Sequence, residues 1–246
     1  MAPRSILVTR PHPDAERTAA GLAALGLEPI VAPMLEARFT GADLPDAAPF
    51  AALAVTSANG VRALAAHPQG ERFANLPVYA VGDHTAAEAR AVGFERISAA
   101  GGTLDDLCAI ILADKPAGPI FYPAPLHQSG DLAGRLAEAG IEVETRILYQ
   151  MCAATVLPPG LDQRLIDGAI AGAVFYSRRT AEIFAGLVSG SQYEQVRRSL
   201  SCLCLSEKVA EPLVDAHFPR IGLADAPSQE AMMTLALAFS QDQISP

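Results

Sequence analysis

The stretch Ile6-Leu7-Val8-Thr9-Arg10-Pro11 opens a segment that recurs 114 residues later (120 − 6), at Ile120-Phe121-Tyr122-Pro123-Ala124-Pro125. Both copies continue without a gap through a leucine, a glycine and a glutamate, which are Leu22, Gly26 and Glu28 in the first copy and Leu136, Gly140 and Glu142 in the second. An internal repeat of this kind indicates two similar structural units. We therefore expect two similar lobes, with the functional site in a cleft between them.

Further along the chain, other segments recur in the same order. Ala54-Val55-Thr56-Ser57 is echoed by Val174-Phe175-Tyr176-Ser177. Four later residues have counterparts in the second half, and the paired positions are Ala86 with Ala210, Phe94 with Phe218, Arg96 with Arg220 and Ile97 with Ile221. The repeat thus extends over most of the chain.

The first copy begins as a strand, a helix and a second strand. Residues 6–8 are a short aliphatic run, residues 14–25 form an alanine-rich helix that Gly26 ends, and residues 28–33 return as a strand. This order is the signature of a parallel sheet. We predict an α/β fold of two similar lobes, each a parallel β-sheet flanked by helices. Two composition breaks, near residues 37–49 and 151–162, predict that the chain crosses twice between the lobes.

The same patterns predict the remaining elements. We expect strands at residues 50–55, 78–81, 120–122, 142–149, 173–176 and 202–205. Helices are expected at 60–66, 85–92, 130–139, 179–188 and 207–216, with further helices beginning at Thr103, where Asp106 completes a capping pattern, and near Ser228.

Bulk composition excludes several classes of protein. Half of the 246 residues are hydrophobic and 18% are charged, with a net charge of −9. An acidic chain is a poor generic binder of nucleic acid, and no apolar run approaches the roughly 20 residues of a membrane helix. The N-terminus lacks the pattern of a signal peptide, so we expect a cytoplasmic protein. The four cysteines show no CxxC spacing and the five histidines are scattered, which predicts buried free thiols and no metal site.

Two turns after predicted strands are candidates for binding anions. In Thr56-Ser57-Ala58-Asn59-Gly60, Ser57 is a suitable N-cap, and the amides of residues 58–60 are expected to point outward towards an anion. The simpler alternative is that Ser57 and Asn59 only cap a helix. The equivalent turn is Tyr176-Ser177-Arg178-Arg179-Thr180, whose arginines could hold carboxylates in a bidentate manner or could form a solvated first turn.

A third turn, Val81-Gly82-Asp83-His84-Thr85, would present the Thr85 hydroxyl at a helix start. Its counterpart, Leu205-Ser206-Glu207-Lys208-Val209, lacks both the glycine and the threonine. The chain contains no GxGxxG after a strand, no GxxxxGK[ST], no GxSxG and no HExxH. Dinucleotide, P-loop, nucleophile-elbow and zinc-protease chemistry therefore lack support, and we expect no cofactor.

Taken in order, these segments resemble the uroporphyrinogen-III synthase family over nearly the whole chain. The resemblance rests on Val8-Thr9-Arg10-Pro11, Gly26-Leu27-Glu28-Pro29, Pro33-Met34-Leu35-Glu36, Val55-Thr56-Ser57-Ala58-Asn59-Gly60-Val61, Val78-Tyr79-Ala80-Val81-Gly82 before Thr85-Ala86, and Gly140-Ile141-Glu142-Val143 leading to Tyr149. It implies one lobe at 38–150 and another that combines 1–36 with 163–246.

The resemblance also implies a function. Members of the family cyclise hydroxymethylbilane, a linear tetrapyrrole octa-acid, to uroporphyrinogen III, with loss of water and inversion of ring D. Such an enzyme is a lyase of haem biosynthesis that needs no metal or redox cofactor, and we expect a monomer whose partner is this small molecule. The resemblance implies that Tyr149 donates a proton to the leaving hydroxyl. It further implies substrate-binding roles for Arg10, Ser57, Asn59, Thr85, Ser177, Arg178 and Lys208.

Two other functions remain open from the residues alone. One is a two-lobed cytoplasmic binding protein for a small anionic ligand, without turnover. The other is a different α/β enzyme that uses Ser57 as a nucleophile, which requires a histidine and an acid to converge on Ser57.

Overall fold

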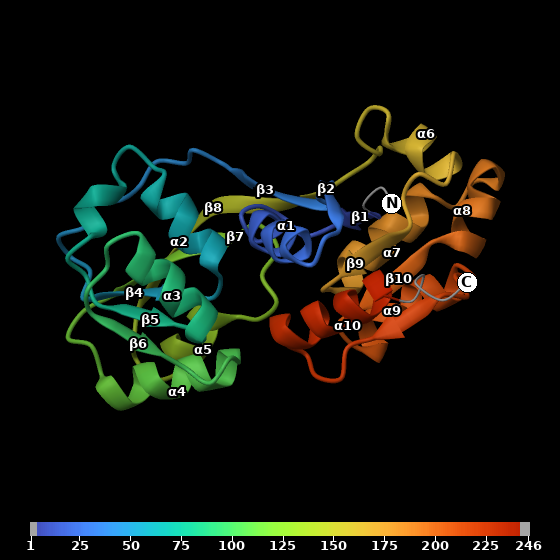
Figure 1. Cartoon of the computed structure of the whole chain (residues 1–246). Coiled ribbons are helices and arrows are strands. Elements are labelled where there is room, and N and C mark those ends of the chain that lie inside the picture. Colours follow the sequence, from blue (N-terminus) through green and yellow to red (C-terminus); the bar gives the residue numbers. More distant parts are fainter. Residues whose placement is uncertain (1–3, 242–246) are drawn as a thin grey trace. The chain divides into compact units, whose positions relative to one another are not determined.

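The computed structural model describes residues 4–241, which divide into two compact units (Figure 1). Lobe 1 combines the residues up to Glu36 with those from Cys152 onward, and lobe 2 comprises Ala37–Met151. Two strands, β3 (Leu35–Phe39) and β8 (Val143–Ala153), straddle the boundaries between the units. The chain therefore passes twice from one lobe to the other.

The sheet of lobe 1 has five strands in the order β11-β10-β9-β1-β2. All neighbouring strands in it are parallel. The strands are β1 (Ser5–Val8), β2 (Glu28–Val31), β9 (Gly172–Phe175), β10 (Ser201–Cys204) and β11 (Ile221–Leu223). The central strands are buried on both faces, which explains why they are continuous apolar runs rather than alternating ones.

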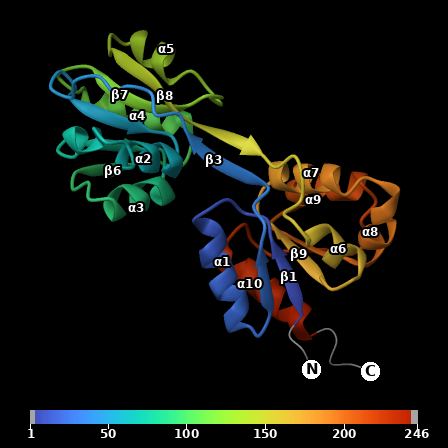
Figure 2. The ribbon, with the colours of Figure 1, turned by 90° about the horizontal axis from the view of Figure 1, so that it is seen from above.

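Helices cover both faces of this sheet. They are α1 (Asp14–Ala24), α6 (Leu161–Ile166), α7 (Arg178–Leu187), α8 (Glu194–Ser199), α9 (Glu207–Asp215) and α10 (Gln229–Gln241), with a 3-10 turn at Ser191–Tyr193. Leu7 and Phe175 pack with α7 and α9 in one core, whereas Val8 and Val174 pack with α1 and α10 in the other. Figure 2 shows α1 and α10 side by side on one face of the sheet.

Lobe 2 contains a six-stranded sheet in the order β3-β8-β7-β4-β5-β6. Its other strands are β4 (Ala52–Val55), β5 (Val78–Ala80), β6 (Ile97–Ala99) and β7 (Ile120–Pro125). The pairs β8 with β7, β7 with β4, β4 with β5 and β5 with β6 are all parallel. Its helices are α2 (Ala58–Ala65), α3 (Asp83–Ala91), α4 (Leu104–Asp114) and α5 (Leu132–Ala137), with a 3-10 turn at Gly70–Phe73. Leu53 and Val55 face the core under α2 and α3, and Ala52 and Ala54 face the other core.

The five strands of lobe 1 match five of the six strands of lobe 2, and β3 has no counterpart. When the order of lobe 1 is read from β2 to β11, β2 corresponds to β8, β1 to β7, β9 to β4, β10 to β5 and β11 to β6. Each copy of the sequence repeat therefore gives its first strand–helix–strand unit to one lobe and the rest to the other lobe. Each copy therefore contains one crossing between the lobes, which gives two crossings in the whole chain.

The α/β class and the two parallel sheets are confirmed, whereas several element boundaries are corrected. The expected break at 37–49 contains the end of β3, and that at 151–162 contains the end of β8 and the start of α6. Helix α2 begins at Ala58 rather than residue 60 because Ser57 caps it, and α3 begins at Asp83 rather than Thr85. The capping box between Thr103 and Asp106 is present. The short elements β6, β11, α6 and α8 were not predicted, since three to six residues carry too little periodicity.

Candidate active site

A pocket of about 380 Å³ lies at the carboxyl ends of the parallel strands of lobe 2. The residues that line it lie on β7 and β8 or in the segments that follow β4, β5, β6 and β7: Thr56, Ser57, Asn59, Val81, Gly102, Leu104, Tyr122, Pro125, His127, Ser129, Gly130, Tyr149 and Met151. In open α/β sheets this edge is where ligands generally bind, because loops of adjustable shape and helix N-termini gather there. Three of the sequence-predicted residues, Ser57, Asn59 and Tyr149, meet in this pocket.

Tyr149 is the most deeply placed of these three residues. Its side chain comes from β8 and is 3% exposed. Burial raises the pKa of Tyr149, a hydrogen bond with Ser57 lowers it, and the nearby Tyr122 raises it again. The net shift of the pKa is upward, so the phenol keeps its proton at neutral pH but is a weaker acid than a free tyrosine.

A second phenol, Tyr122 on β7, also lines the pocket, and the sequence analysis did not select it. Its hydroxyl is 2.8 Å from the Thr56 hydroxyl, and either group can be the donor. Burial raises the pKa of Tyr122, and the bond with Thr56 opposes this shift. The repeat contains one signal for this residue. Tyr122 aligns with Val8, and a side chain with a polar group is unusual within a buried parallel strand.

The turn from β4 to α2 combines capping with binding groups. Ser57 is the N-cap of α2, and its hydroxyl accepts a hydrogen bond from the Asn59 amide at 3.2 Å. The Gly60 amide donates to the Ser57 carbonyl at 3.0 Å. The expectation that the amides of residues 58–60 all point outward is therefore wrong for Asn59 and Gly60, which satisfy the turn itself. The partners that the structure gives Ser57 are thus its own turn and Tyr149, and no histidine base is among them within residues 4–241.

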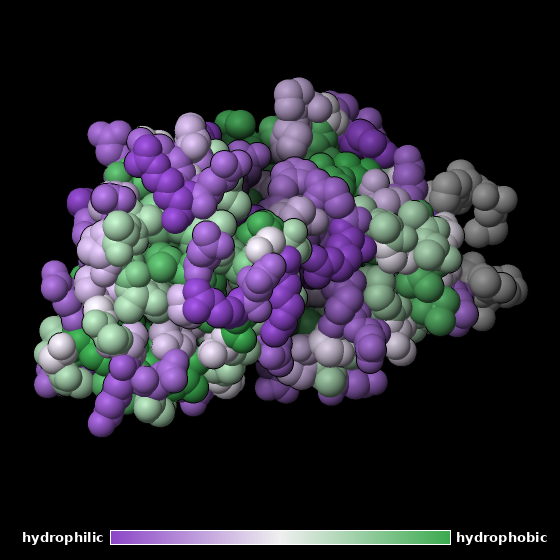
Figure 3. Space-filling model, turned by 90° about the vertical axis from the view of Figure 1, so that its left-hand side faces the viewer, coloured by the Kyte–Doolittle hydropathy of each residue, from purple (hydrophilic) through white to green (hydrophobic). Residues whose placement is uncertain are grey.

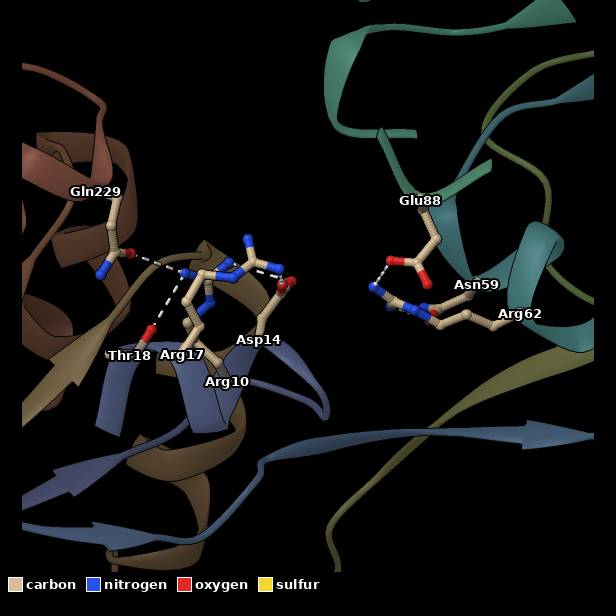
Figure 4. A network of polar contacts seen from close by, with 8 residues as sticks. All are labelled: Arg10, Asp14, Arg17, Thr18, Asn59, Arg62, Glu88 and Gln229. Atoms are coloured by element: carbon tan, nitrogen blue, oxygen red, sulfur yellow. Dashed lines mark hydrogen bonds and ion pairs between the residues drawn. The ribbon is translucent and has the colours of Figure 1, made fainter. Parts of the chain in front are cut away.

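The Asn59 side chain is fixed by two neighbours. Its amide oxygen accepts a hydrogen bond from Arg62 at 3.1 Å (Figure 4). Its amide nitrogen lies 3.3 Å from the sulfur of Met151. Arg62 in turn contacts Glu88 on α3 at 2.6 Å. The Asn59 amide therefore stands in the pocket in a single orientation.

Thr85 does not line the pocket. It lies in the first turn of α3, whose N-cap is Gly82, and only 4% of it is exposed. The sequence predicts Thr85 as the first residue of this helix, but α3 begins at Asp83. Thr85 is therefore the third helical residue and is enclosed by its own lobe.

In lobe 1, Arg10 is held by four neighbouring side chains. Its guanidinium donates to Thr18 at 3.3 Å and to Gln229 at 3.1 Å, and it pairs with Asp14 at 3.2 Å (Figure 4). It also lies 4.1 Å above the centre of the Tyr176 ring. Burial raises the pKa of Tyr176, and the contacts with Thr18 and Arg10 oppose this shift. These contacts tie the end of β1 to α1, to the start of α10 and to the residue after β9.

The other expected residues of lobe 1 follow β9 and β10. Ser177 caps α7 and accepts a hydrogen bond from the Thr180 amide at 3.2 Å. Arg178, about half exposed, pairs with Glu211 on α9 at 3.4 Å. Lys208 is exposed in the first turn of α9. All three lie at the carboxyl edge of the sheet of lobe 1, where their charges and hydroxyl could meet a carboxylate-bearing ligand.

Two further observations concern metals and membranes. In residues 4–241, no group of three or more His, Cys, Asp or Glu side chains is arranged to hold a metal ion. The four cysteines are free, and burial raises the pKa of Cys204 to about 12. Within the same residues, no helix has the length and apolar character needed to cross a membrane. The face drawn in Figure 3 correspondingly mixes hydrophilic and hydrophobic residues.

Comparison with solved structures identifies the fold. A uroporphyrinogen-III synthetase from Helicobacter pylori matches with a TM-score of 0.62 at 19% identity, over 96% of this chain and 99% of that chain. A mutant uroporphyrinogen III synthase from Thermus thermophilus matches with a TM-score of 0.50 at 16% identity, over 97% of this chain and 98% of that chain. At these identities the matches show a shared fold. The search of curated proteins found no match.

A family model decides the classification. The model described as "Uroporphyrinogen-III synthase HemD" matches residues 16–234, which include all of lobe 2 with the whole lining of its pocket and most of lobe 1. The match covers far more than half of the chain. The chain therefore belongs to the uroporphyrinogen-III synthase family.

Proposed function

We propose that this protein converts hydroxymethylbilane to uroporphyrinogen III as a lyase that needs no cofactor. The family match supports this reaction, and the observation that carries it in the structure is the protonated Tyr149 phenol in the pocket at the carboxyl edge of the lobe 2 sheet. The reaction needs a proton donor for one hydroxyl group and binding sites for many carboxylates. It needs no electron transfer, because cyclisation with loss of water is redox-neutral overall.

The first step is loss of the terminal hydroxyl of ring A. We propose that Tyr149 gives its proton to this hydroxyl as the C–O bond breaks, which releases water and leaves an electrophilic azafulvenium cation on ring A and the phenolate of Tyr149. The Ser57 hydroxyl, which is hydrogen-bonded to Tyr149, orients the phenol. Ring D then attacks this cation through its substituted carbon, which forms a spiro C–C bond. The bond from the same carbon to the methylene bridge of ring C breaks and leaves an azafulvenium cation on ring C. The unsubstituted carbon of ring D attacks that cation, so the macrocycle closes with ring D inverted, and the proton lost from this carbon restores the Tyr149 phenol. Holding these reacting ends together is the larger task, since positioning supplies much of the rate of such a cyclisation.

The dimensions of the pocket limit what it can hold. A linear tetrapyrrole is larger than 380 Å³, so the pocket takes one end of the chain rather than the whole molecule. We propose that this end carries the hydroxymethyl group, because Tyr149 and Ser57 line the pocket. Ser57, Asn59 and His127 would contact the acetate or propionate groups of that end.

We further propose that lobe 1 binds the remaining carboxylates through Arg10, Ser177, Arg178 and Lys208. Arg178 and Lys208 are the exposed cations of this set. Thr85, also expected to bind substrate, is enclosed within lobe 2 and would act only by supporting the start of α3. The two lobes would then be the domains of the enzyme, bounded near residues 37–49 and 151–162, and we propose that it works as a monomer in the cytoplasm.

The test is an isomer assay. Freshly generated hydroxymethylbilane is supplied to the folded protein, and the products are oxidised and separated as uroporphyrin isomers. Unassisted closure gives isomer I, so predominant isomer III that depends on the protein is the expected result. Isomer I alone, from protein that is folded by circular dichroism, would remove the proposed activity and favour an anion-binding protein without turnover.

A further inference from the structure

Behind the pocket of lobe 2 lies a chain of three polar side chains. Glu88 on α3 contacts Arg62 Nη2 at 2.6 Å, and Arg62 Nη1 donates to the Asn59 oxygen at 3.1 Å (Figure 4). Asn59 lines the pocket, whereas neither Arg62 nor Glu88 does. Arg62 and Glu88 are 15% and 18% exposed, so the pair is mostly enclosed. The chain therefore runs from the packed α2–α3 contact to the binding surface.

The donor character of arginine fixes which end of the amide faces the pocket. A guanidinium has five N–H donors and no acceptor, so it can bond only to the oxygen of the Asn59 amide. The nitrogen of the amide must then point the other way, where it lies 3.3 Å from the sulfur of Met151. Both Asn59 and Met151 line the pocket. Arg62 thus presents Asn59 to the pocket as a hydrogen-bond donor.

The present partner of that donor is weak. A thioether sulfur accepts a hydrogen bond poorly, whereas a carboxylate accepts a stronger, charge-assisted one. A substrate carboxylate that enters the pocket would therefore displace the Met151 sulfur at little cost. The Met151 side chain is flexible enough to move aside.

Glu88 keeps Arg62 from binding the substrate directly. The carboxylate compensates the guanidinium charge within α2 and α3, and one terminal nitrogen serves Glu88 while the other serves Asn59. The Arg62 Nε atom is buried and has no hydrogen-bond partner within residues 4–241, so these two terminal contacts hold the side chain. The geometry needs a forked cation, because a single ammonium group could serve only one of the two partners fully.

From these contacts we infer that Arg62, supported by Glu88, is a positioning residue that holds the Asn59 amide as a donor for a substrate carboxylate. The inference rests on the proposed function for the identity of the substrate. The geometry itself holds for any ligand with a carboxylate that enters the pocket.

The test separates positioning from folding by comparing conservative variants. Arg62→Lys keeps the charge opposite Glu88 but loses the fork, so it should fold and should raise KM for hydroxymethylbilane about tenfold with kcat within about twofold. Asn59→Ala should raise KM by a similar factor. In Asn59→Ala/Arg62→Lys the second change should add nothing, since Arg62 acts through Asn59. Arg90→Lys, an exposed arginine on α3, is the matched control and should behave as wild type.

A second readout does not depend on turnover. Uroporphyrin III, a stable cyclic octa-acid, is titrated against each variant, and the side-chain amide signals of Asn59 are followed by NMR. We expect Arg62→Lys to shift these signals and to weaken uroporphyrin III binding about tenfold. Absence of isomer III with wild-type protein would count against the proposed function, and the titration would then decide the inference alone. Additive effects in the double variant, or unchanged Asn59 signals in Arg62→Lys, would overturn the inference.

Discussion

Gly60 and Pro123 approach each other so closely that a Cβ atom at Gly60 would lie 2.7 Å from the Pro123 carbonyl oxygen. The same Cβ would lie 3.7 Å from Cε1 of Tyr149. Helix α2 therefore packs directly on β7 and on the ring of the proposed proton donor. The absence of a side chain at residue 60 lets α2 lie this close to β7 and Tyr149.

Gly60→Ala should lower the free energy of unfolding by about 1–3 kcal/mol, because a backbone oxygen cannot move aside as a flexible side chain can. It should also reduce turnover by displacing the Tyr149 ring. Gly186→Ala in α7 is the matched control, since nothing lies within 4 Å of its added Cβ. That change should stabilise the protein by about 0.5–1 kcal/mol. Equal denaturation midpoints for the two variants would show that α2 and β7 are not in such close contact.

Tyr149→Phe should lower kcat by about 10²–10⁴-fold, the usual contribution of a positioned general acid. The loss of one hydroxyl leaves the packing of the ring intact, so the thermal unfolding midpoint should change little. Tyr193→Phe in lobe 1, also buried, is the control. The measurement is the initial rate of isomer III formation under single-turnover conditions, and a rate equal to that of wild type would exclude Tyr149 from proton transfer.

Arg178→Ala should raise KM for hydroxymethylbilane while leaving the fold intact. Its ion pair with Glu211 is about half exposed on both sides, and such pairs contribute at most about 1 kcal/mol to stability. Glu211→Gln removes the same ion pair but keeps the arginine, so its KM should stay at the wild-type value or fall. If both variants changed KM equally, the ion pair rather than the free cation would be responsible.

Tyr79 makes stability fall at alkaline pH. Burial and a hydrogen bond to Asp114 raise the pKa of Tyr79 to about 12, whereas an unfolded tyrosine titrates near ~10. Between these values the unfolded chain has lost the phenolic proton and the folded chain keeps it, so the free energy of unfolding decreases as pH rises. Below about pH 10 the phenol is protonated in both the folded and the unfolded state, so Tyr79 does not make the free energy of unfolding depend on pH.

Tyr79→Phe tests this linkage. Urea unfolding is measured at several pH values from about 9 to about 12, a range that includes the pKa of the unfolded and of the folded tyrosine. The variant should show a slope of unfolding free energy against pH that is smaller by about one proton. Phe73, an aromatic residue that cannot titrate, offers the control Phe73→Leu, which should lower stability equally at every pH. A slope unchanged in Tyr79→Phe would assign the alkaline loss to the other buried tyrosines.

The repeat, and with it the two parallel sheets, can be predicted from the residues alone. Short aliphatic runs such as residues 6–8 and 120–122, each followed by a helix and a returning strand, can be buried on both faces only in this type of sheet. The residues also predict the cap of α2 by Ser57 and the capping box at Thr103, because these contacts lie within three residues. Local chemistry of this kind is legible in a sequence.

Which of these groups share a pocket depends on the tertiary structure. Tyr122 and Thr56 are 66 residues apart in sequence and meet because β7 pairs with β4. Arg62 and Glu88 meet through the packing of α2 on α3, whereas Thr85 is buried in the first turn of α3 and does not line the pocket. Contacts between distant segments depend on strand order and helix packing, and neither is encoded in the residues on one side of the contact alone.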